Sequence, residues 1–532
     1  MTTEPATNPT KQTSMPSLKR RPPYFLLAVL LLTSGGWLAA FLFDFPAIEN
    51  VAIAIFVGLN FVCLPFWLDR LTNWPALVRW SPIFVAILAG IAFFALIEIR
   101  GVDGNLVPTE FGWRFGAPDA DYQLASVENE QLALSSEEFT INPEEDFYQF
   151  LGPNRRGEMD AISLDPNWEE TPPKPIWKQP IGAGWSAFVI ADGYAFTQEQ
   201  RGEKEAVTCY KADTGELVWS HAEEIRYDSV VAGDGPRATP TLYQDHILAI
   251  GSTGVFVCLD AKSGELQWKH DFTEEYGAEN PQWGYSASPL GYKNTAIAVA
   301  GGDDGKSIIA YDLESGEEVW GTGGESASYS SPTLVNLLDT EQLIVLTESH
   351  CYSLNPEDGS HYWDFDWKGS NAGSCTVSQP VAVDHEHVLL SKGYGIGAEL
   401  IKISQDEEGD WSAESVWKNR NLKTKFTNVV QQGDYVYGLD EGIFSCVEWK
   451  TGRKMWKKGR FGHGQILRVG DWILILSEQG ELVLVSVNPD KFEQVATFPA
   501  LEGKTWNNLA LEGVMLYVRN FQEAACYELP TK

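Results

Sequence analysis

One short pattern returns along this chain and constrains its fold more than any other feature: a glycine followed four residues later by a tryptophan. It closes the stretch Ala212-Asp-Thr-Gly-Glu-Leu-Val-Trp219 and recurs in Ala261–Trp268, Leu313–Trp320, Pro356–Trp363 and Trp449–Trp456. The glycine permits a tight turn, and the tryptophan lies on the strand that leaves it. Repeats with a period of about 20–50 residues indicate a propeller, a solenoid or another repeat array.

Two alignments of the chain against itself count the same number of repeats. The first follows the tryptophan, and its members are Trp177, Trp219, Trp268, Trp320, Trp363, Trp417 and Trp456, with Phe498 in the eighth place. The second follows a four-residue segment early in each repeat, and the first residues of its eight copies are Trp185, Arg237, Ser286, Tyr329, Val377, Phe426, His463 and Trp506. Turn and apolar-strand patterns after each segment predict four strands per repeat.

The two ends of the repeat region complete each other. Trp177 lies in a lone predicted strand before the first full repeat, whereas the last repeat, from Trp506 to Leu529, has three strands and no tryptophan at the repeated position. Pairing the lone strand with the last three predicts an all-β, eight-bladed propeller over residues 147–532, closed by its amino-terminal strand. Closure leaves few free strand edges, and free edges pair with other chains.

The repeated tryptophans have a structural explanation. A large aromatic ring buries about 150–250 Å², so we expect each ring to pack on the turn of the next blade and to anchor the two blades together. Cys209, Cys258, Cys446 and Cys526 occupy equivalent positions in different blades. Equivalent positions are too far apart for a disulfide, whose Cα atoms lie about 4.4–6.8 Å apart. These cysteines are therefore predicted to be small buried residues.

Three apolar segments precede the repeats and predict a membrane anchor. They cover about residues 23–43, 51–68 and 82–99 and follow a polar tail, residues 1–22, that is predicted to be disordered and cytoplasmic. About 20 apolar residues in a helix cross the roughly 30 Å of a bilayer core. A cleaved signal peptide is the alternative for the first segment, but two further apolar segments follow it.

Basic residues predict the orientation of this anchor. Lys19, Arg20 and Arg21 precede the first segment, and Arg70 and Arg79 lie between the second and the third. Because basic residues stay on the cytoplasmic side, the amino terminus is predicted to be inside. With three crossings in the cytoplasmic membrane, the propeller is predicted to lie on its outer, periplasmic side.

The charge of the chain limits its partners. Residues 101–146 contain eleven acidic residues and one basic residue, and we read them as an acidic spacer. The whole chain has a formal net charge of −34. This charge argues against binding to nucleic acid, because nucleic-acid binders need a basic surface that displaces counterions.

A functional site is expected where the repeats disagree. The glycine and tryptophan positions look alike from blade to blade, whereas the first position of the second alignment does not. Because the inner strands of a propeller line its channel, these first residues are expected to form a ring at the channel mouth. Six of these first residues, with two residues that directly precede the segments, are the candidate ligand- or partner-binding residues: Trp185, Arg237, Tyr285, Tyr329, Lys425, Phe426, His463 and Trp506.

The candidates combine aromatic faces with two fixed cations. Aromatic rings stack on planar or carbohydrate ligands, and Arg237 offers a fork for carboxylate or phosphate. The alternative is that the rings fill the channel and the cations pair with acidic neighbours such as Asp234 or Glu325. His463 is interpreted as a polar surface residue rather than a general base. No catalytic residue and no metal ligand is assigned.

The glycine–tryptophan repeats resemble those of the PQQ-repeat family, the eight-bladed propellers of quinoprotein alcohol dehydrogenases. Phe150-Leu-Gly-Pro-Asn-Arg-Arg-Gly157 is also similar to the entry motif of a bacterial subfamily of PQQ-binding-like propellers. The repeats are similar, too, to the BamB-like propellers of the outer-membrane β-barrel assembly machine, which keep the repeats without a cofactor. For the dehydrogenases the resemblance implies PQQ with calcium. It also implies two adjacent cysteines, which this sequence lacks.

Two functions follow from these observations. The first is a non-catalytic binding or scaffolding propeller at the bacterial envelope, which takes an envelope protein or a small ligand at its channel mouth. The alternative is a PQQ-dependent dehydrogenase of the alcohol or polyvinyl-alcohol type that passes electrons to the membrane. The sequence names neither a substrate nor a partner.

Overall fold

The computed structural model describes residues 63, 75–115, 139–143, 145–368 and 375–532. The first two predicted membrane segments, about 23–43 and 51–68, therefore lie outside the described residues, apart from residue 63. The chain divides into two compact units. One comprises residues 1–98 with 111–116, and the other comprises residues 99–110 with 117–532.

The helix α3 (Ala76–Leu96) is the main described element of the first unit. It begins directly after Pro75 and ends where Ile97 becomes extended, so it starts six residues before the predicted segment 82–99 and stops three residues before its end. Large apolar side chains are exposed along it, among them Leu77, Val85 and Phe94. No helix in the described ranges is both long enough and apolar enough to cross a membrane.

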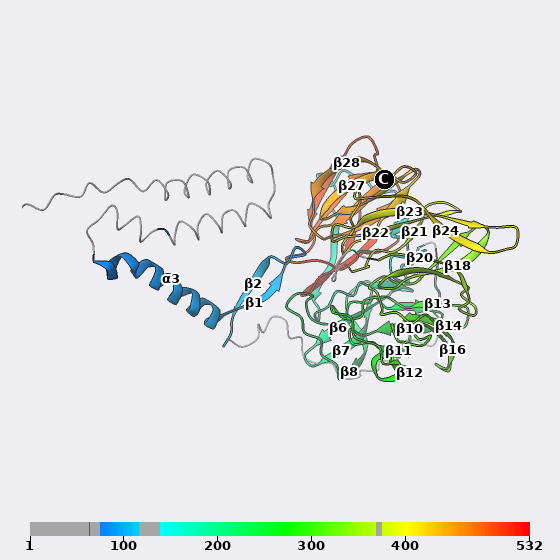
Figure 1. The fold of residues 1–532 in the computed structure, drawn as a ribbon, viewed down its shortest axis with the longest axis horizontal. Helices are drawn as coiled ribbons and strands as arrows, with labels where there is room; N and C mark the ends of the chain where they lie inside the picture. The colour runs from blue at the N-terminus through cyan, green and yellow to red at the C-terminus, as the bar shows by residue number, and fades with distance from the viewer. Residues whose placement is uncertain (1–62, 64–74, 116–138, 144, 369–374) are drawn as a thin grey trace, which may run out of the picture. The chain divides into compact units, whose positions relative to one another are not determined.

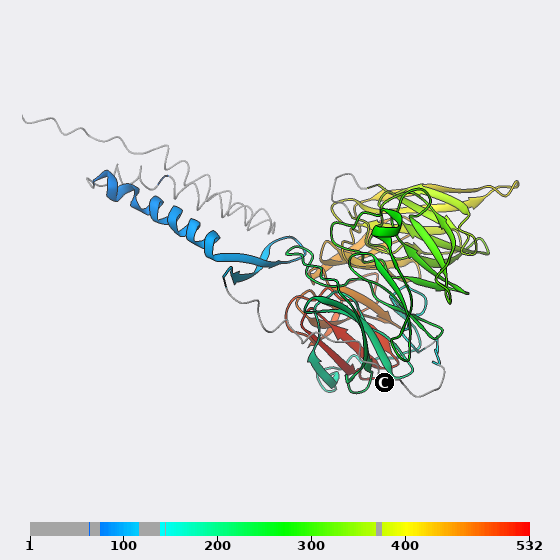
Figure 2. The same ribbon diagram turned by 90° about the horizontal axis from the view of Figure 1, so that it is seen from below.

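The second unit is the predicted eight-bladed β-propeller (Figures 1 and 2). Its first four blades are antiparallel sheets that follow one another along the chain. Their strands are β5 (Val189–Ala191), β6 (Tyr194–Arg201), β7 (Lys204–Lys211) and β8 (Leu217–Glu223); β9 (Thr241–Tyr243), β10 (His246–Ile250), β11 (Val255–Asp260) and β12 (Leu266–Asp271); β13 (Leu290–Tyr292), β14 (Thr295–Val299), β15 (Ile308–Asp312) and β16 (Glu318–Thr322); and β17 (Thr333–Leu337), β18 (Thr340–Leu346), β19 (His350–Leu354) and β20 (His361–Asp366). A short helix, α4 (Phe272–Tyr276), follows the second blade and is capped by Asp271.

The remaining blades continue the ring. Their strands are β21 (Val381–Ala382), β22 (His387–Lys392), β23 (Gly397–Gln405) and β24 (Trp411–Asn419); β25 (Val430–Gln432), β26 (Tyr435–Asp440), β27 (Ile443–Glu448) and β28 (Arg453–Arg460); β29 (Gln465–Val469), β30 (Trp472–Leu476), β31 (Glu481–Ser486) and β32 (Gln494–Pro499); and β33 (Ala510–Glu512), β34 (Met515–Arg519), β35 (Glu523–Glu528) and β4 (Lys174–Pro180). Outside the blades, β1 (Ile97–Val102) and β2 (Pro108–Trp113) form a two-stranded sheet, and β3 (Glu158–Met159) adds to the inner edge of the seventh blade.

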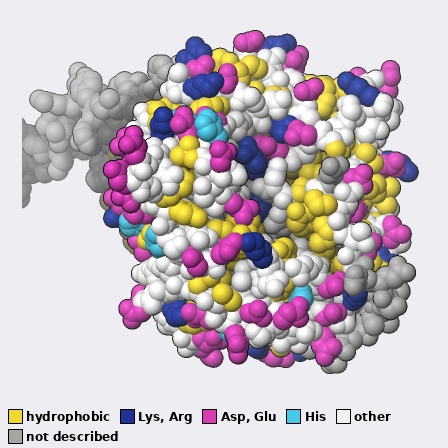
Figure 3. Space-filling view, turned by 90° about the vertical axis from the view of Figure 1, so that its right-hand side faces the viewer, with side chains coloured by type: hydrophobic (Ala, Val, Ile, Leu, Met, Phe, Trp, Pro, Cys, Tyr) yellow, Lys and Arg dark blue, Asp and Glu magenta, His cyan; other side chains and the backbone are white. Residues whose placement is uncertain are grey.

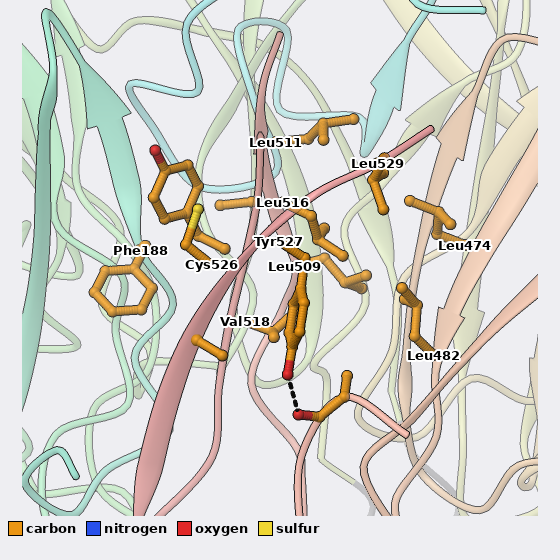
Figure 4. Packing of buried hydrophobic residues seen from close by; sticks show 14 of the residues in the cluster. Phe188, Leu474, Leu482, Leu509, Leu511, Leu516, Val518, Cys526, Tyr527 and Leu529 are labelled. Atoms are coloured by element: carbon orange, nitrogen blue, oxygen red, sulfur yellow. Dashed lines mark hydrogen bonds between the residues drawn. The ribbon is translucent and has the colours of Figure 1, made fainter. Parts of the chain in front are cut away.

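The ring closes as the sequence predicts. The early strand β4 pairs antiparallel with the late strand β35, which places Trp177 opposite Cys526. Figure 4 shows the apolar packing at this closure, where Leu509 and Leu516 of the last blade lie near Leu474 and Leu482 of the seventh. The Tyr527 hydroxyl donates a hydrogen bond of 2.6 Å to the carbonyl of Ala500, which is the dashed line in Figure 4.

The glycine–tryptophan repeat joins neighbouring blades. Trp219 is fully buried, and its indole N–H donates to the carbonyl of Ala261 in the next blade over 3.1 Å. A Cβ atom on Gly264 would lie 2.5 Å from the Trp219 ring, and the φ of Gly264 is +70°. The glycine is therefore required twice, for its left-handed backbone and for the room that it leaves to the indole. Equivalent indole–carbonyl bonds start from Trp177, Trp268, Trp320, Trp417 and Trp456.

Trp363 departs from this pattern. Its indole donates to Oε1 of Gln342 in its own blade, over 2.9 Å. The next blade has no short glycine turn to accept it, because β23 and β24 continue into a long hairpin with its turn at residues 406–410. In the eighth place, the Phe498 ring makes an edge-on contact with Tyr527, with centroids 5.1 Å apart.

The repeated cysteines lie inside the blades. Cys209, Cys258, Cys446 and Cys526 are fully buried, and each is the cross-strand partner of a docking tryptophan. No disulfide joins any of the described cysteines. Burial raises the pKa values of these four thiols, those of Cys446 and Cys526 to about 12. The prediction of small buried residues is confirmed.

Replacing one docking ring tests its contribution to stability. Trp219→Ala removes a fully buried indole and its bond to the next blade. We expect it to lower the free energy of unfolding by about 3–5 kcal/mol, as large-to-small core substitutions do. Urea denaturation of the purified chain measures this loss. Val319→Ala, at an exposed position next to Trp320, should change the same quantity by about 0.5 kcal/mol or less.

Candidate functional site

A segment that precedes the blades forms the floor of the channel. Residues 147–159 run across the inner strands and include the sequence motif that resembles an entry motif. The Arg155 guanidinium is buried and donates to the carbonyls of Ser288 and Pro289 in the third blade, over 3.0 and 2.9 Å. Burial lowers the Arg155 pKa to about 9. Arg156 reaches the fifth and sixth blades, where it donates to the carbonyl of Ala382 and the side chain of Gln431.

A belt of hydrogen bonds follows part of the channel above this floor. It joins the third residues of six of the eight four-residue segments, whereas the ring predicted from sequence uses the first residues. The Ala187 amide donates to the Thr239 hydroxyl, the Thr239 amide to Ser288, and the Ser288 amide to Ser331, over 3.1, 2.9 and 2.8 Å. Farther around the ring, the Gln379 amide donates to Oδ1 of Asn428. The belt explains why polar side chains recur at this position.

A cavity of about 560 Å³ opens at the channel mouth. Its wall contains seven aromatic rings, two cations and four side-chain amides. The lining residues are Asp103, Leu106, Phe150, Trp185, Val231, Ala232, Arg237, Gln282, Trp283, Ser286, Tyr329, Val377, Tyr394, Lys425, Phe426, Asn428, Gln465, Trp506 and Asn508. Seven of the eight first-position residues therefore line one cavity.

The rings form two groups. In one group, Trp506 packs on Trp185 and on Phe426, with ring centroids 4.8 and 5.2 Å apart. In the other group, Trp283 lies between Tyr329 and Tyr394, with centroids 5.8 and 6.2 Å apart. Between the rings lie the side-chain amides of Gln282, Asn428, Gln465 and Asn508. The wall thus offers ring faces together with a few polar groups.

Among the described residues, no acidic side chain forms a salt bridge with either cation. The Arg237 guanidinium donates to the carbonyls of Ala232, Gly233 and Gly235 and lies 4.3 Å from the Tyr227 ring centroid. Its fork is therefore engaged by its own loop rather than by Asp234. The Lys425 ammonium lies 5.0 Å from the Tyr394 ring and 5.2 Å from the Phe426 ring. Burial lowers the pKa of both cations.

Residues 102–106, which we call the tip, cover one side of the mouth. They belong to the propeller unit although the sequence places them in the acidic spacer. The Gly104 amide donates to Oε1 of Glu478 over 2.7 Å, and the Gly104 carbonyl accepts from Lys425. Oδ1 of Asn105 lies 3.1 Å from Nε2 of His463. Asp103 and Leu106 of the tip contribute to the cavity wall.

Two of the eight candidate residues do not line the cavity. Tyr285 is buried in the apolar core, and its hydroxyl donates to the carbonyl of Ala300 over 2.9 Å. His463 is 2 % exposed, so its interpretation as a surface residue is wrong. The tip covers it, and no sequence signal linked the tip to the propeller. Burial, followed by the nearby Lys425 charge, lowers the His463 pKa.

Sequence reasoning missed several members of the site. Trp283 and Tyr394 lie in loops outside the aligned segments, and Phe150 belongs to the floor. Tyr394 is flanked by Gly393 and Gly395, and the tip contains Asp103-Gly104, a frequent turn signal. These glycine-flanked positions were the available signals, but they give no information on where the loops pack.

The cavity does not fit the calcium ion that the family resemblance implies. Among the described lining residues the one acidic side chain is Asp103, whose Oδ1 already accepts the amide hydrogens of Asn105 and Val107. Across the part of the chain that the structure describes, no three His, Cys, Asp or Glu side chains are grouped as metal ligands would be. The chemistry of this wall is that of a binding site for rings and polar groups.

Comparison with protein families agrees with the repeats. The family model described as outer membrane protein assembly factor BamB, a PQQ-type repeat family, matches residues 203–458, just under half of the chain. The resemblance to PQQ-repeat propellers predicted from the sequence is thereby confirmed. No curated protein matches the sequence.

Solved structures share the fold. A quinohemoprotein alcohol dehydrogenase from Comamonas testosteroni is 12% identical, with a TM-score of 0.54 over 74% of this chain and 81% of its own. A europium-containing methanol dehydrogenase is 10% identical, with a TM-score of 0.54 over 73% and 98%. BamB from Moraxella catarrhalis is 15% identical, with a TM-score of 0.49 over 67% and 100%. At these identities the likeness to the two dehydrogenases shows the propeller fold alone.

Proposed function

We propose that this chain is a non-catalytic, membrane-anchored propeller that binds a ligand or a protein partner at its channel mouth. The observation that carries the proposal is the cavity of about 560 Å³, whose wall combines seven aromatic rings with two cations and four side-chain amides. The cavity combines mostly apolar walls with a few polar groups, as ligand sites do.

The family match supports a place at the bacterial envelope. The matching family is described as an outer membrane protein assembly factor, and this chain carries its repeats over residues 203–458. A scaffolding partner in the envelope is therefore part of the proposal. Acidic side chains are spread among Lys, Arg and apolar side chains on the face shown in Figure 3, and the net charge of −34 opposes a nucleic-acid partner.

We propose a three-segment anchor in the cytoplasmic membrane, with the propeller on the outer side. The apolar segments at about 23–43, 51–68 and 82–99, with basic residues before the first and between the last two, support it. The exposed apolar side chains of α3 agree with an apolar environment for the third segment. The number of crossings determines on which side of the membrane the propeller lies, because two crossings would leave it in the cytoplasm.

Protease access to the propeller tests this orientation. Protease added to intact spheroplasts should degrade the propeller, while a cytoplasmic marker protein survives. Survival of the propeller until the cells are lysed would contradict the proposed side. That result would show that the number of crossings is even.

Binding of a planar aromatic anion tests the cavity. We expect 8-anilinonaphthalene-1-sulfonate to bind the purified full chain saturably, since ring faces and cations suit it. Trp506→Ala and Tyr394→Ala should each weaken binding about tenfold, a loss near 1.4 kcal/mol. Trp411→Ala, in the distant hairpin of the fifth blade, is the matched control and should bind as the native chain does. Failure of the native chain to bind saturably would contradict the proposal.

The same purified chain tests the alternative function, a PQQ-dependent dehydrogenase. The chain incubated with PQQ and calcium should show neither a saturable quinone spectrum nor alcohol-dependent reduction of an electron-accepting dye. Saturable binding with turnover would overturn the non-catalytic assignment and establish the quinoprotein alternative.

A further inference from the structure

The tip, residues 102–106, is a turn that holds its own shape. Oδ1 of Asp103 accepts the amide hydrogens of Asn105 and Val107, over 2.8 and 2.9 Å. The Leu106 amide donates to the Asp103 carbonyl over 2.9 Å, and Leu106 has a φ of +65°. Because these bonds lie within the turn, its conformation does not depend on the propeller surface beneath it.

The channel mouth contacts the main chain of this turn. Glu478 accepts the Gly104 amide hydrogen, and Lys425 donates to the carbonyl of the same residue. A third charged side chain, Lys504, donates to the Val102 carbonyl over 3.2 Å. Contacts to backbone atoms recognise the shape of a turn rather than its side chains, so the mouth can accept other turns of the same shape.

One position of the turn is nevertheless selective. A Cβ atom on Gly104 would lie 2.1 Å from the His463 ring. The His463 ring in turn is positioned by its contact with Asn105 and by the Phe426 ring, 5.2 Å away. The mouth therefore requires glycine at the apex and favours an amide side chain after it.

The tip covers the charged groups that bind it. With the tip in place, Lys425 is 9% exposed and Glu478 is 5% exposed. Glu478 also accepts hydrogen bonds from the Trp506 indole and the His463 amide, which hold its carboxylate in position. Hydrogen bonds to charged groups are stronger than those between neutral groups. A turn of the same shape can form the same two bonds, whether it belongs to this chain or to a partner.

We propose that the channel mouth is a receptor for a glycine-tipped polypeptide turn, which residues 102–106 occupy in cis and which the turn of a protein partner can occupy in their place. This inference deepens the proposed function by naming the chemistry of the partner, and it rests on that function only for the identity of the binding surface. The partner's turn carries glycine at its apex, with aspartate before it and asparagine after it. The cis tip competes with it through its high effective concentration.

A labelled peptide tests the proposal. The probe is a cyclised, fluorescein-labelled peptide of residues 99–110, and its fluorescence anisotropy is measured against the full chain in detergent. Gly104→Leu, whose side chain cannot fit against His463, should vacate the mouth and bind the peptide saturably. The native chain should bind it at least tenfold more weakly, because its own tip competes.

Controls separate recognition from nonspecific binding. Gly324→Leu is the matched glycine variant, since a Cβ atom there would meet nothing closer than 3.8 Å, and it should behave as the native chain. Adding Lys425→Met to Gly104→Leu should weaken peptide binding at least tenfold, and a peptide with leucine in place of Gly104 should not bind. Asp103→Ala with Asn105→Ala weakens the cis turn without added bulk and should give the same gain of binding as Gly104→Leu.

Each outcome decides the question. Folded Gly104→Leu and Asp103→Ala/Asn105→Ala chains that fail to bind the peptide would overturn the receptor assignment, as would binding that Lys425→Met leaves unchanged. The aromatic anion is measured on the same variants. Loss of dye binding with peptide binding retained would contradict the cavity proposal alone, and the reverse result would contradict this inference alone.

Discussion

The contact between an indole ring and the glycine of the next blade is the interaction on which this structure depends. At Trp219 and Gly264 the ring occupies the space that a Cβ atom would fill, and the indole N–H is bound to the carbonyl three residues before the glycine. Repeated around the ring, this contact sets the distance between blades. The closure of β4 on β35 follows from the same geometry, because Trp177 in the early strand docks on the turn that contains Gly215. The channel and its mouth exist because that ring is closed.

Much of the fold could be predicted because the sequence repeats. A residue that recurs at the same place in each copy meets the same local structural requirement in each blade. The glycine is needed for the turn, and the tryptophan is needed for the contact with the next blade. The predicted blade count and closure are confirmed. Trp363 shows the limit of this reasoning, because its partner depends on the next blade, where a long hairpin replaces the glycine turn. The structure uses Gln342 of the same blade instead, and no repeat signal indicates this choice.

The site could be predicted in part. Its ring of first-position residues was found from the positions where the copies differ, and seven of the eight line the cavity. The floor and the tip were not found, because both come from outside the repeats and their contacts join residues hundreds of positions apart, such as Gly104 with Glu478. Periodicity carries no information on such contacts. His463 was misread for this reason, since the tip that buries it lies in a stretch whose composition suggested only an acidic spacer.

Repeated and unrepeated residues therefore have different roles in this structure. Repeated residues such as Trp219 fasten the blades, and unrepeated residues such as Lys425 and Glu478 give the mouth its specificity for a main-chain turn. Hydrogen–deuterium exchange at the Gly104 amide tests this most directly. We expect this amide to exchange at least tenfold more slowly in the native chain than in the free 99–110 peptide, because Glu478 accepts its hydrogen. Exchange at the rate of the free peptide would contradict it.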